Sequence, residues 1–539
     1  MLPLYLRDPL FSCYVENPLV RQNTFRTMAA DFSPLPTFDA SRHLLPRPIW
    51  QGHQSAIDCY WKAWELAFGH LRQPIAGSGL VAPYIDMAFN GHVFLWDSVF
   101  SLMFGRYGAR AFNFQRTLDD LYCKQHLDGF ICREIDSADG QDCFHRHDPS
   151  STGPNVFAWG EWEHYRNFAD RDRLARVFPV LLAYHQWMRD HRTWQDGSYW
   201  SCGWASGMDN QPRVPEGYSP AHSPAHQSWV DACLQAILSA RVLLRMGKEL
   251  GMDEQQENAA MAAARAQAGR DTANSPRPSA AALRPLTQLR AEVAHLERFV
   301  NERMWDQERG FYYDLRRDGT RSQRMTIGAF WALLAEVVPA GRLRRFVGPL
   351  DDPEKFNRPH RVPSIPADDP AYCPHGNYWC GSVWPVAEYM VLRGLTQTGC
   401  DELAHAIGLN HVENVTRVFE KTQTLWENYA PETATQGNPA LPDFVGFSGI
   451  GPIAVLLEYV MGLRPDAPQH RLLWDVRLLD EHGVDDYPFG KEGRLNVLCA
   501  ARNTLSEKPQ VKVQSTVPLE VELRWQGGSE TFNVGTATT

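Results

Sequence analysis

Apolar residues recur at helical spacing along most of the chain. Ile57, Trp61, Trp64 and Phe68 fall at i, i+4, i+7 and i+11, which places them on one face of a helix. Similar patterns predict about twelve helices, near residues 53–68, 92–108, 110–125, 158–168, 172–190, 219–250, 284–304, 325–337, 340–349, 377–397, 401–421 and 447–462. The main body of the protein is therefore predicted to be helical.

Three of these helices are followed by a glycine turn and then by aromatic residues. The turns are Asp128-Gly129-Phe130, Asp196-Gly197-Ser198-Tyr199 and Arg309-Gly310-Phe311-Tyr312. Glycine lets the chain reverse with a positive φ, and the aromatic residues then favour short hairpin strands. Helical hairpins joined in this way suit a closed toroid of two concentric helix rings. The alternative is that such turns simply end helices of any fold.

The pattern divides the chain into three parts. Residues 1–50 contain several prolines and little periodicity, which indicates an extended arm packed on the main domain. The helical part is predicted to cover 51–465, with a surface insertion near 255–285, where the sequence turns Ala-rich and then Ser/Pro-rich.

The last part, 466–539, is rich in strand-forming residues. Strands are predicted at 472–479, 494–500, 510–513 and 517–525, with turns at His482-Gly483 and Gly527-Gly528. This indicates a small β-sandwich-like domain at the end of the chain.

Composition narrows the class of protein. Of the 539 residues, 44% are hydrophobic and 22% are charged, which is typical of a globular protein. The net charge is −10 and there is no basic run, so nucleic acid is not expected as a partner. No apolar run is long enough to predict a membrane-spanning helix. The N-terminus lacks a secretory pattern, and the 11 cysteines include no CxxC pair, which favours reduced thiols in a cytoplasmic protein. The 18 tryptophans modestly favour a carbohydrate site, because indole rings stack on sugars. Oligomeric state stays open, with a homo-oligomer compatible.

Two segments carry candidate chemistry. Cleavage of a glycosidic bond needs an acid for the leaving oxygen and a carboxylate that activates water or attacks carbon. In Gly203–Arg213, Asp209 is a lone carboxylate among neutral neighbours, where desolvation would raise its pKa and keep it protonated. In Leu425–Glu432, Glu427 lies between aromatic residues. Taken alone, the first segment is more typical of a turn and the second of a structural acceptor.

Four motifs in order resemble glycoside hydrolase family 63 and its trehalase and mannosylglycerate-hydrolase relatives. Gly203–Arg213 resembles the acid loop of that clan, and Trp426-Glu427-Asn428-Tyr429 is similar to its Glu-x-Tyr base loop. Leu95–Ser98 looks like its Trp-Asp-[ST] element, and Tyr378–Pro385 looks like its Tyr-Trp-Arg-Gly-x-[IV]-Trp-Pro element. The resemblance spans roughly residues 80–460 and implies a mainly α fold, an (α/α)6 barrel, with an inverting mechanism in which Asp209 is the general acid and Glu427 the general base.

The resemblance also suggests which residues bind the sugar. Asp97 would accept sugar hydroxyls, the alternative being a charge at a helix N-terminus. Arg213 would hold a hydroxyl or fix the acid loop, or else form a salt bridge elsewhere. Aromatic residues are predicted to wall the pocket, with core packing as the alternative for each: Trp96, Trp204, Trp379, Trp384, Trp426 and Tyr429.

The chain departs from the family pattern in two places. Cys380 stands where the family has arginine after Tyr-Trp. In Pro154–Glu163, where relatives carry Pro-Pro and a neutral helix, Trp159 is a candidate wall residue, and Glu161 and Glu163 are extra acids that either reach the pocket or face solvent on the helix. These departures put the identity of the substrate in doubt more than the class of reaction.

The segment His145-Arg146-His147-Asp148 is a candidate for either a metal site or a substrate-contacting loop. An HxH pair can bind zinc, but no cluster at zinc spacing follows it, and no EF-hand or phosphate-binding loop is present. We therefore expect no cofactor and no metal, although some relatives carry calcium, and we keep Arg146 as a candidate substrate contact.

The sequence thus predicts an exo-acting, inverting, α-specific glycosidase that acts on a small glycoside or oligosaccharide end. One alternative is a sugar epimerase or phosphorolytic enzyme on the same barrel, which would favour paired catalytic histidines or lack the water-activating glutamate. Another is a carbohydrate-binding pseudoenzyme, against which the presence of both Asp209 and Glu427 argues.

Overall fold

A computed structural model describes residues 16–87, 90–252 and 285–536. All but the last residue of the predicted insertion at 255–285 lies outside the described residues, as do the first fifteen residues of the predicted arm. Among the described helices, none combines the length and apolar character needed to cross a bilayer.

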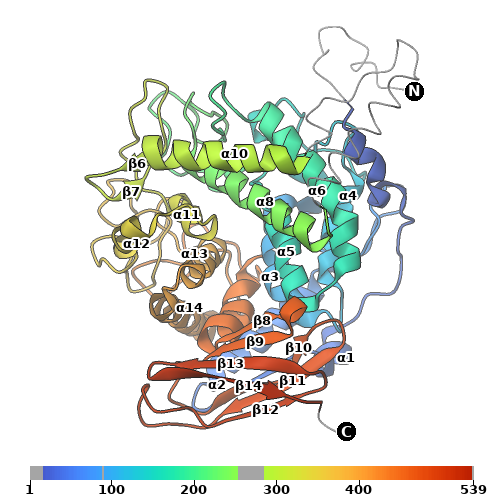
Figure 1. Ribbon diagram of the computed structural model, residues 1–539, viewed down its shortest axis with the longest axis vertical. Helices are drawn as coiled ribbons and strands as arrows, with labels where there is room; N and C mark the ends of the chain where they lie inside the picture. The colour runs from blue at the N-terminus through green and yellow to red at the C-terminus, as the bar shows by residue number, and fades with distance from the viewer. Residues whose placement is uncertain (1–15, 88–89, 253–284, 537–539) are drawn as a thin grey trace.

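The body of the molecule is helical, and each predicted helix has a helical counterpart (Figure 1). Two predicted helices begin later than their pattern suggests: the segment at 219–250 becomes helical at Val230, and that at 377–397 at Pro385, where proline suits the first helical position. The helices are α2 (Gln54–Gly69), α3 (Leu95–Gly105), α4 (Thr117–Cys123), α5 (Phe157–Phe168), α6 (Arg171–His191), α8 (Val230–Glu249), α10 (Pro285–Phe299), α11 (Trp331–Leu334), α12 (Ala340–Val347), α13 (Pro385–Gln397), α14 (Asp401–Thr422) and the π-helix η13 (Gly451–Val460).

Shorter helical pieces connect these elements. They include α1 (Phe38–Ser41), α7 (Gly203–Ser206) and the 3-10 turns η3 (Pro18–Gln22), η4 (Thr24–Thr27), η6 (Arg106–Gly108) and η12 (Ser448–Ile450). In α2 the predicted stripe is buried at Ile57, Trp64 and Phe68, while Trp61 is only partly buried, with the Arg42 guanidinium 4.4 Å from its ring centroid.

The three glycine turns reverse the chain as predicted. Gly129, Gly197 and Gly310 have φ values of 102°, 81° and 67°. After the last of them, β6 (Trp305–Asp306) pairs with β7 (Phe311–Tyr312) as a short antiparallel hairpin. At Gly129 a side chain would also collide with the backbone, because an added Cβ would lie 2.5 Å from the Ala183 carbonyl oxygen.

The C-terminal strands form a layer below the helices in Figure 1. One four-stranded sheet has the order β1-β10-β11-β12 and the other β14-β13-β9-β8. Their bounds are β1 (Arg47–Trp50), β8 (Leu463–Asp466), β9 (Arg471–Asp475), β10 (His482–Phe489), β11 (Gly493–Cys499), β12 (Val511–Ser515), β13 (Leu519–Trp525) and β14 (Gly528–Val534). Strand β1 comes from the predicted arm, so the two ends of the chain share one sheet.

The predicted turn at His482-Gly483 is wrong. Both residues lie in β10, with His482 paired to Cys499 and Gly483 to Leu498. Glycine is needed there for close approach between strands, because an added Cβ would lie 2.1 Å from the Val497 carbonyl oxygen. The pair Gly527-Gly528 does lie at the reversal between β13 and β14.

Candidate active site

The four motifs that are far apart in the sequence meet at one pocket of about 380 Å³. Its lining includes three acids, one cation and a wall of aromatic side chains. The acids are Asp97, Asp209 and Glu427; the cation is Arg133; the aromatic residues are Phe94, Trp96, Trp204, Tyr378, Trp379, Trp384, Phe444 and Phe447. The structure therefore brings together both predicted catalytic acids and five of the predicted binding residues, Trp96, Asp97, Trp204, Trp379 and Trp384.

Asp209 lies in a turn that follows the short helix α7. The next residue, Asn210, ties this turn to the Tyr378 segment: its side-chain oxygen accepts the Trp379 N–H at 2.8 Å and its amide donates to the Asn377 carbonyl at 3.1 Å. Gln211 then donates to the Ser364 carbonyl. Because these bonds cross from one loop to another, they fix the backbone that carries Asp209.

Glu427 lies in an extended segment that pairs on both sides. Its N–H donates to the Leu441 carbonyl at 3.0 Å, and the neighbouring Tyr429 exchanges backbone hydrogen bonds with Val383. Its carboxylate accepts the Tyr378 hydroxyl at 3.1 Å and the Leu441 N–H at 3.3 Å. Both donors favour the ionised form of Glu427.

Burial changes the acidity of all three carboxylic acids. Desolvation raises the pKa of Asp209 to about 6, against the favourable charge of Arg133. Desolvation also raises the pKa of Glu427 to about 7, with a further contribution from the negative charge of Asp209. Asp97, in the first turn of α3, has its pKa raised to about 7 by burial, and Asp209 and Glu427 add to the shift. The three acids therefore interact electrically within one pocket.

Two indole rings form one side of the pocket. Trp379 and Trp384 stack in parallel, with centroids 4.2 Å apart and an interplanar angle of 2°. The Trp384 Nε1–H donates to the Tyr378 carbonyl at 3.1 Å, and Tyr378 has a positive φ of 56°. Cys380, which replaces the family's arginine, donates its thiol hydrogen to the Asn210 carbonyl at 3.2 Å.

Other predicted binding residues lie outside the described lining of this pocket. Arg213 is buried and forms two ion pairs, with Asp231 and with Asp314, at 2.7 Å each. This is the salt-bridge alternative considered from the sequence. Arg146 is buried against Asp128 in an ion pair rather than turned to the pocket.

Helix α5 holds two more of them in the interior. Trp159 is 2% exposed and packs edge-on against Phe100 and Trp331. Glu161 accepts two hydrogen bonds from the Arg173 guanidinium, at 2.7 and 2.8 Å. The expectation that Glu161 and Glu163 face either the pocket or solvent is wrong, because both are buried in ion pairs with arginines.

Trp426 and Tyr429 flank Glu427 but support its loop. The Trp426 Nε1–H donates to Thr422, and the buried Tyr429 hydroxyl accepts the Trp426 N–H. These contacts hold the backbone of the loop that carries Glu427. Of the two alternatives for Trp426 and Tyr429, pocket wall or core packing, the structure therefore shows packing.

Sequence reasoning missed Arg133 and did not single out Tyr378. Arg133 lies next to β5 (Glu134–Asp136), with its guanidinium 5.5 Å from the Trp204 ring centroid. No motif surrounds it, so only the fold reveals that it is the cation of the pocket. Tyr378 belongs to the Tyr-Trp motif that the sequence shows, so its place in this motif was the signal that could have identified it as a pocket residue.

Away from the pocket, three buried residues that could bind a metal ion lie close together: His360, Glu388 and His411. His360 Nε2 is 3.0 Å from His411 Nδ1, which is in turn 2.5 Å from a Glu388 oxygen. All three are completely buried, and desolvation lowers the pKa of His360 well below its usual range and raises that of Glu388.

Comparison with known proteins places these features in a family. The family described as mannosylglycerate hydrolase MGH1-like glycoside hydrolase domain matches residues 91–440, more than half of the chain. A protein of Borreliella burgdorferi without an assigned function is 21% identical over 358 residues, covering 64% of this chain and 66% of that protein. A probable mannosyl-oligosaccharide glucosidase of Schizosaccharomyces pombe is 24% identical over 312 residues, covering 51% of this chain and 34% of that protein.

Solved structures share the fold at low sequence identity. The GH63 mannosylglycerate hydrolase of Thermus thermophilus, solved in complex with glucose, has a TM-score of 0.55 and 21% identity, and the match covers 73% of this chain and 99% of that one. A GH78 rhamnosidase of Bacillus sp. GL1 has a TM-score of 0.57 and 14% identity, covering 89% of this chain and 42% of that one.

The family match shows that the protein belongs to the class of glycoside hydrolases. Its pocket contains the pair of carboxylic acids that most members of this class use to cleave a glycosidic bond. Within that class, the chain belongs to the MGH1-like glycoside hydrolase domain family. The resemblance to family 63 that the four motifs suggest is thereby confirmed.

Proposed function

We propose that the protein is an exo-acting, inverting glycoside hydrolase that releases a terminal α-linked sugar from a small glycoside or oligosaccharide. The observation that carries the proposal is the meeting of Asp209 and Glu427, each with a raised pKa, in the lining of one aromatic-walled pocket. A pocket of about 380 Å³ suits a chain end better than a long polymer. We also infer that the helices form the (α/α)6 barrel that the family resemblance implies.

In this mechanism Asp209 protonates the leaving oxygen while Glu427 removes a proton from the attacking water. The glycosidic oxygen beside Asp209 is a hydrogen-bond acceptor, and the water beside Glu427 is a donor. Bound substrate therefore favours a protonated Asp209 and an ionised Glu427, and the donors Tyr378 and Leu441 support that ionised state. Water attacks the anomeric carbon, the glycosidic bond breaks, and the proton of Asp209 leaves with the aglycone.

The similar proteins suggest the chemical class of the substrate but not its identity. The names of the similar proteins refer to mannosylglycerate and to mannosyl-oligosaccharide. We propose a small mannoside or glucoside with a short aglycone. The stacked Trp379 and Trp384 offer a flat apolar wall for a sugar ring, and Asp97 offers two acceptor oxygens for its hydroxyls.

The test is a screen of disaccharides and aryl glycosides, with proton NMR of the first-formed anomer. Release of the anomer opposite to that of the substrate is expected, and retention would exclude the inverting mechanism. Phosphate-dependent cleavage, or interconversion of free sugars without hydrolysis, would favour the alternative enzyme classes. Failure to turn over any glycoside would favour a binding protein.

Two variants separate the roles of the acids. Asp209→Asn should lose about 10²–10⁴-fold in rate on a disaccharide but far less on a dinitrophenyl glycoside, whose leaving group needs no proton. Glu427→Gln should lose activity on both substrates. Glu432→Gln is the matched control, because Glu432 lies on the same loop but pairs with Arg358.

A further inference from the structure

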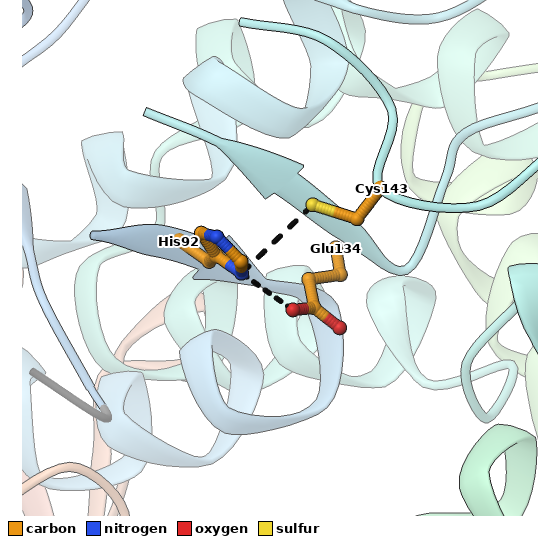
Figure 2. Close-up of side chains that lie close together, drawn as sticks. All are labelled: His92, Glu134 and Cys143. Atoms are coloured by element: carbon orange, nitrogen blue, oxygen red, sulfur yellow. Dashed lines mark hydrogen bonds and ion pairs between the residues drawn. The ribbon is translucent and has the colours of Figure 1, made fainter. Parts of the chain in front are cut away.

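Three side chains with the chemistry of metal ligands converge beside the pocket (Figure 2). His92 Nδ1 lies 2.5 Å from Glu134 Oε1 and 3.8 Å from Cys143 Sγ, and the three ligand atoms all lie within 4.8 Å of one another. Cys143 is exposed and the other two are partly buried, so the cluster is open to ions from solvent.

The backbone holds this arrangement in place. In the antiparallel pair β4 (His92–Phe94) and β5, His92 lies opposite Asp136 and Phe94 opposite Glu134. His92 and Glu134 are therefore diagonal neighbours on one face of the pair. The Cys143 segment continues the sheet, because Asp136 N–H donates to Gln141 and Cys143 N–H donates to the Glu134 carbonyl at 3.0 Å.

We propose that His92, Glu134 and Cys143 form a binding site for a divalent, thiophilic cation of the Zn²⁺ class. Sulfur, imidazole nitrogen and carboxylate oxygen are the ligand types that zinc takes in tetrahedral sites. Zn–S and Zn–N bonds of about 2.3 and 2.0 Å place sulfur and nitrogen roughly 3.5 Å apart at a tetrahedral angle, close to the 3.8 Å between Cys143 Sγ and His92 Nδ1. Glu134 needs to open from its hydrogen bond by less than about 1 Å.

Three protein ligands leave the fourth position of a tetrahedral ion open. Cys143 is exposed, so water fills this position from the solvent side. The site is therefore accessible and exchangeable rather than a closed structural centre. Cation binding releases the thiol proton of Cys143 to solvent. The ring proton of His92 moves from Nδ1 to Nε2 through solvent, and two metal bonds replace the His92–Glu134 hydrogen bond.

The site is bonded directly to the wall of the pocket. The Glu134 carboxylate lies 3.3 Å from the guanidinium of Arg133, and the His92 N–H donates to the Asn90 side chain at 3.1 Å. Asn90 and Arg133 both line the pocket. A bound cation would therefore fix the hairpin that presents these two residues to the pocket. The sequence alone predicted no metal site, so this proposal departs from that expectation.

The experiment is an anaerobic titration of the full chain with Co²⁺, followed by absorption spectroscopy. One equivalent is expected to bind with a thiolate-to-cobalt charge-transfer band and the visible bands of tetrahedral cobalt, and Zn²⁺ should displace it. Cys143→Ser should abolish the charge-transfer band, and His92→Ala should weaken binding by more than the roughly 10–100-fold that loss of an outer partner costs.

Two control variants keep the test specific. His145→Ala removes a histidine from the same loop, only two residues after Cys143, and Cys373→Ser removes a partly exposed thiol elsewhere. Both should bind Co²⁺ like the parent chain, with circular dichroism verifying the fold of every variant. Absence of binding, a spectrum without thiolate ligation, or equal affinity in Cys143→Ser would overturn the proposal. Because the readout is optical, its outcome is independent of hydrolytic activity.

Discussion

At the scale of single residues, the chemistry of the pocket comes from burial of acids that act on one another. Asp97, Asp209 and Glu427 all have raised pKa values, and Arg133 is the opposing charge for Asp97 and Asp209. Such a set does not ionise residue by residue; it loses its protons in shared steps. The pocket therefore keeps at least one proton on its acids near neutral pH. In the free pocket this proton lies mainly on Glu427 or Asp97, whose pKa values exceed that of Asp209, and the bound glycosidic oxygen must draw it to Asp209 for cleavage.

The pH dependence of kcat/KM follows from these pKa values. Below both pKa values Glu427 is protonated and accepts no proton from water; above both, Asp209 has lost the proton for the leaving oxygen. With values of about 6 and about 7, a bell-shaped profile with its maximum between pH 6 and 7 is expected. Initial rates on a disaccharide from pH 4 to 10 measure it, and a maximum above about pH 9 would contradict the assignment.

Tyr378→Phe should impair the base without emptying the pocket. The Tyr378 hydroxyl donates to Glu427 and lowers its pKa, so its loss should raise that pKa further. Because Glu427 has the higher of the two pKa values, the alkaline limb of the profile should move to higher pH. A hydrogen bond to a charged group contributes about 1.5–3 kcal/mol, so kcat should fall by roughly 10–100-fold. Tyr372→Phe, which loses a similar bond to Glu432 away from the pocket, should leave the profile unchanged.

At the scale of elements, the catalytic groups lie on loops that are tied to one another. Asn210 joins the Asp209 turn to the Tyr378 segment, and Val383 joins the same segment to the extended segment of Glu427 through Tyr429. The middle segment thus sets the positions of both acids, although neither acid belongs to it. Loops fixed in this way can hold two distant groups at a defined separation.

Asn210→Ala should lower kcat with little change in KM or Tm. It removes the bonds to Trp379 and Asn377 and frees the Asp209 turn, and a displacement of about 1 Å in a catalytic group costs roughly 10²-fold in rate. Steady-state kinetics and a thermal melt separate this result from general unfolding. Asn410→Ala loses two comparable loop bonds, to Arg361 and Pro359, and should keep full activity. An equal loss in both variants would refute a positioning role for Asn210.

The helices were predictable because amphipathic spacing is a local property of the sequence, as in α2. The catalytic acids were predictable only through the ordered motifs around them. Arg213 and Glu161 are candidate pocket residues because of the motif segments that hold them, with a salt bridge and a solvent-facing position as the respective alternatives. Their actual partners, Asp314 and Arg173, are set by the fold. Local sequence carries no record of such long-range pairs, and for the same reason it did not reveal Arg133.

At the scale of the whole molecule, a buried charge network joins helices from both halves of the chain. Arg106 in η6 pairs with Glu458 in η13 at 2.5 Å, and Arg393 in α13 pairs with Glu163 in α5 at 2.6 Å. Arg393 also lies 3.7 Å from Glu458, which links the two pairs. Removing one partner from such a network leaves a buried charge without compensation, so the network imposes one arrangement on these helices.

Glu163→Gln should therefore destabilise the protein by about 3–5 kcal/mol at pH 7. Burial raises the pKa of Glu163, but Arg393, Arg166 and Arg106 outweigh it and bring the value down to about 2. Because the folded pKa lies below the usual value of 4.5, this stabilisation is fully present above pH 4.5 and is lost as pH falls toward 2. The difference between parent and variant in urea midpoint and Tm should therefore shrink as pH falls below 4.5. As a control, Glu413→Gln removes an exposed ion pair with Arg417 and should lower the free energy of unfolding by about 0.5 kcal/mol or less. If the two variants are equally stable at pH 7, the buried network does not stabilise the fold.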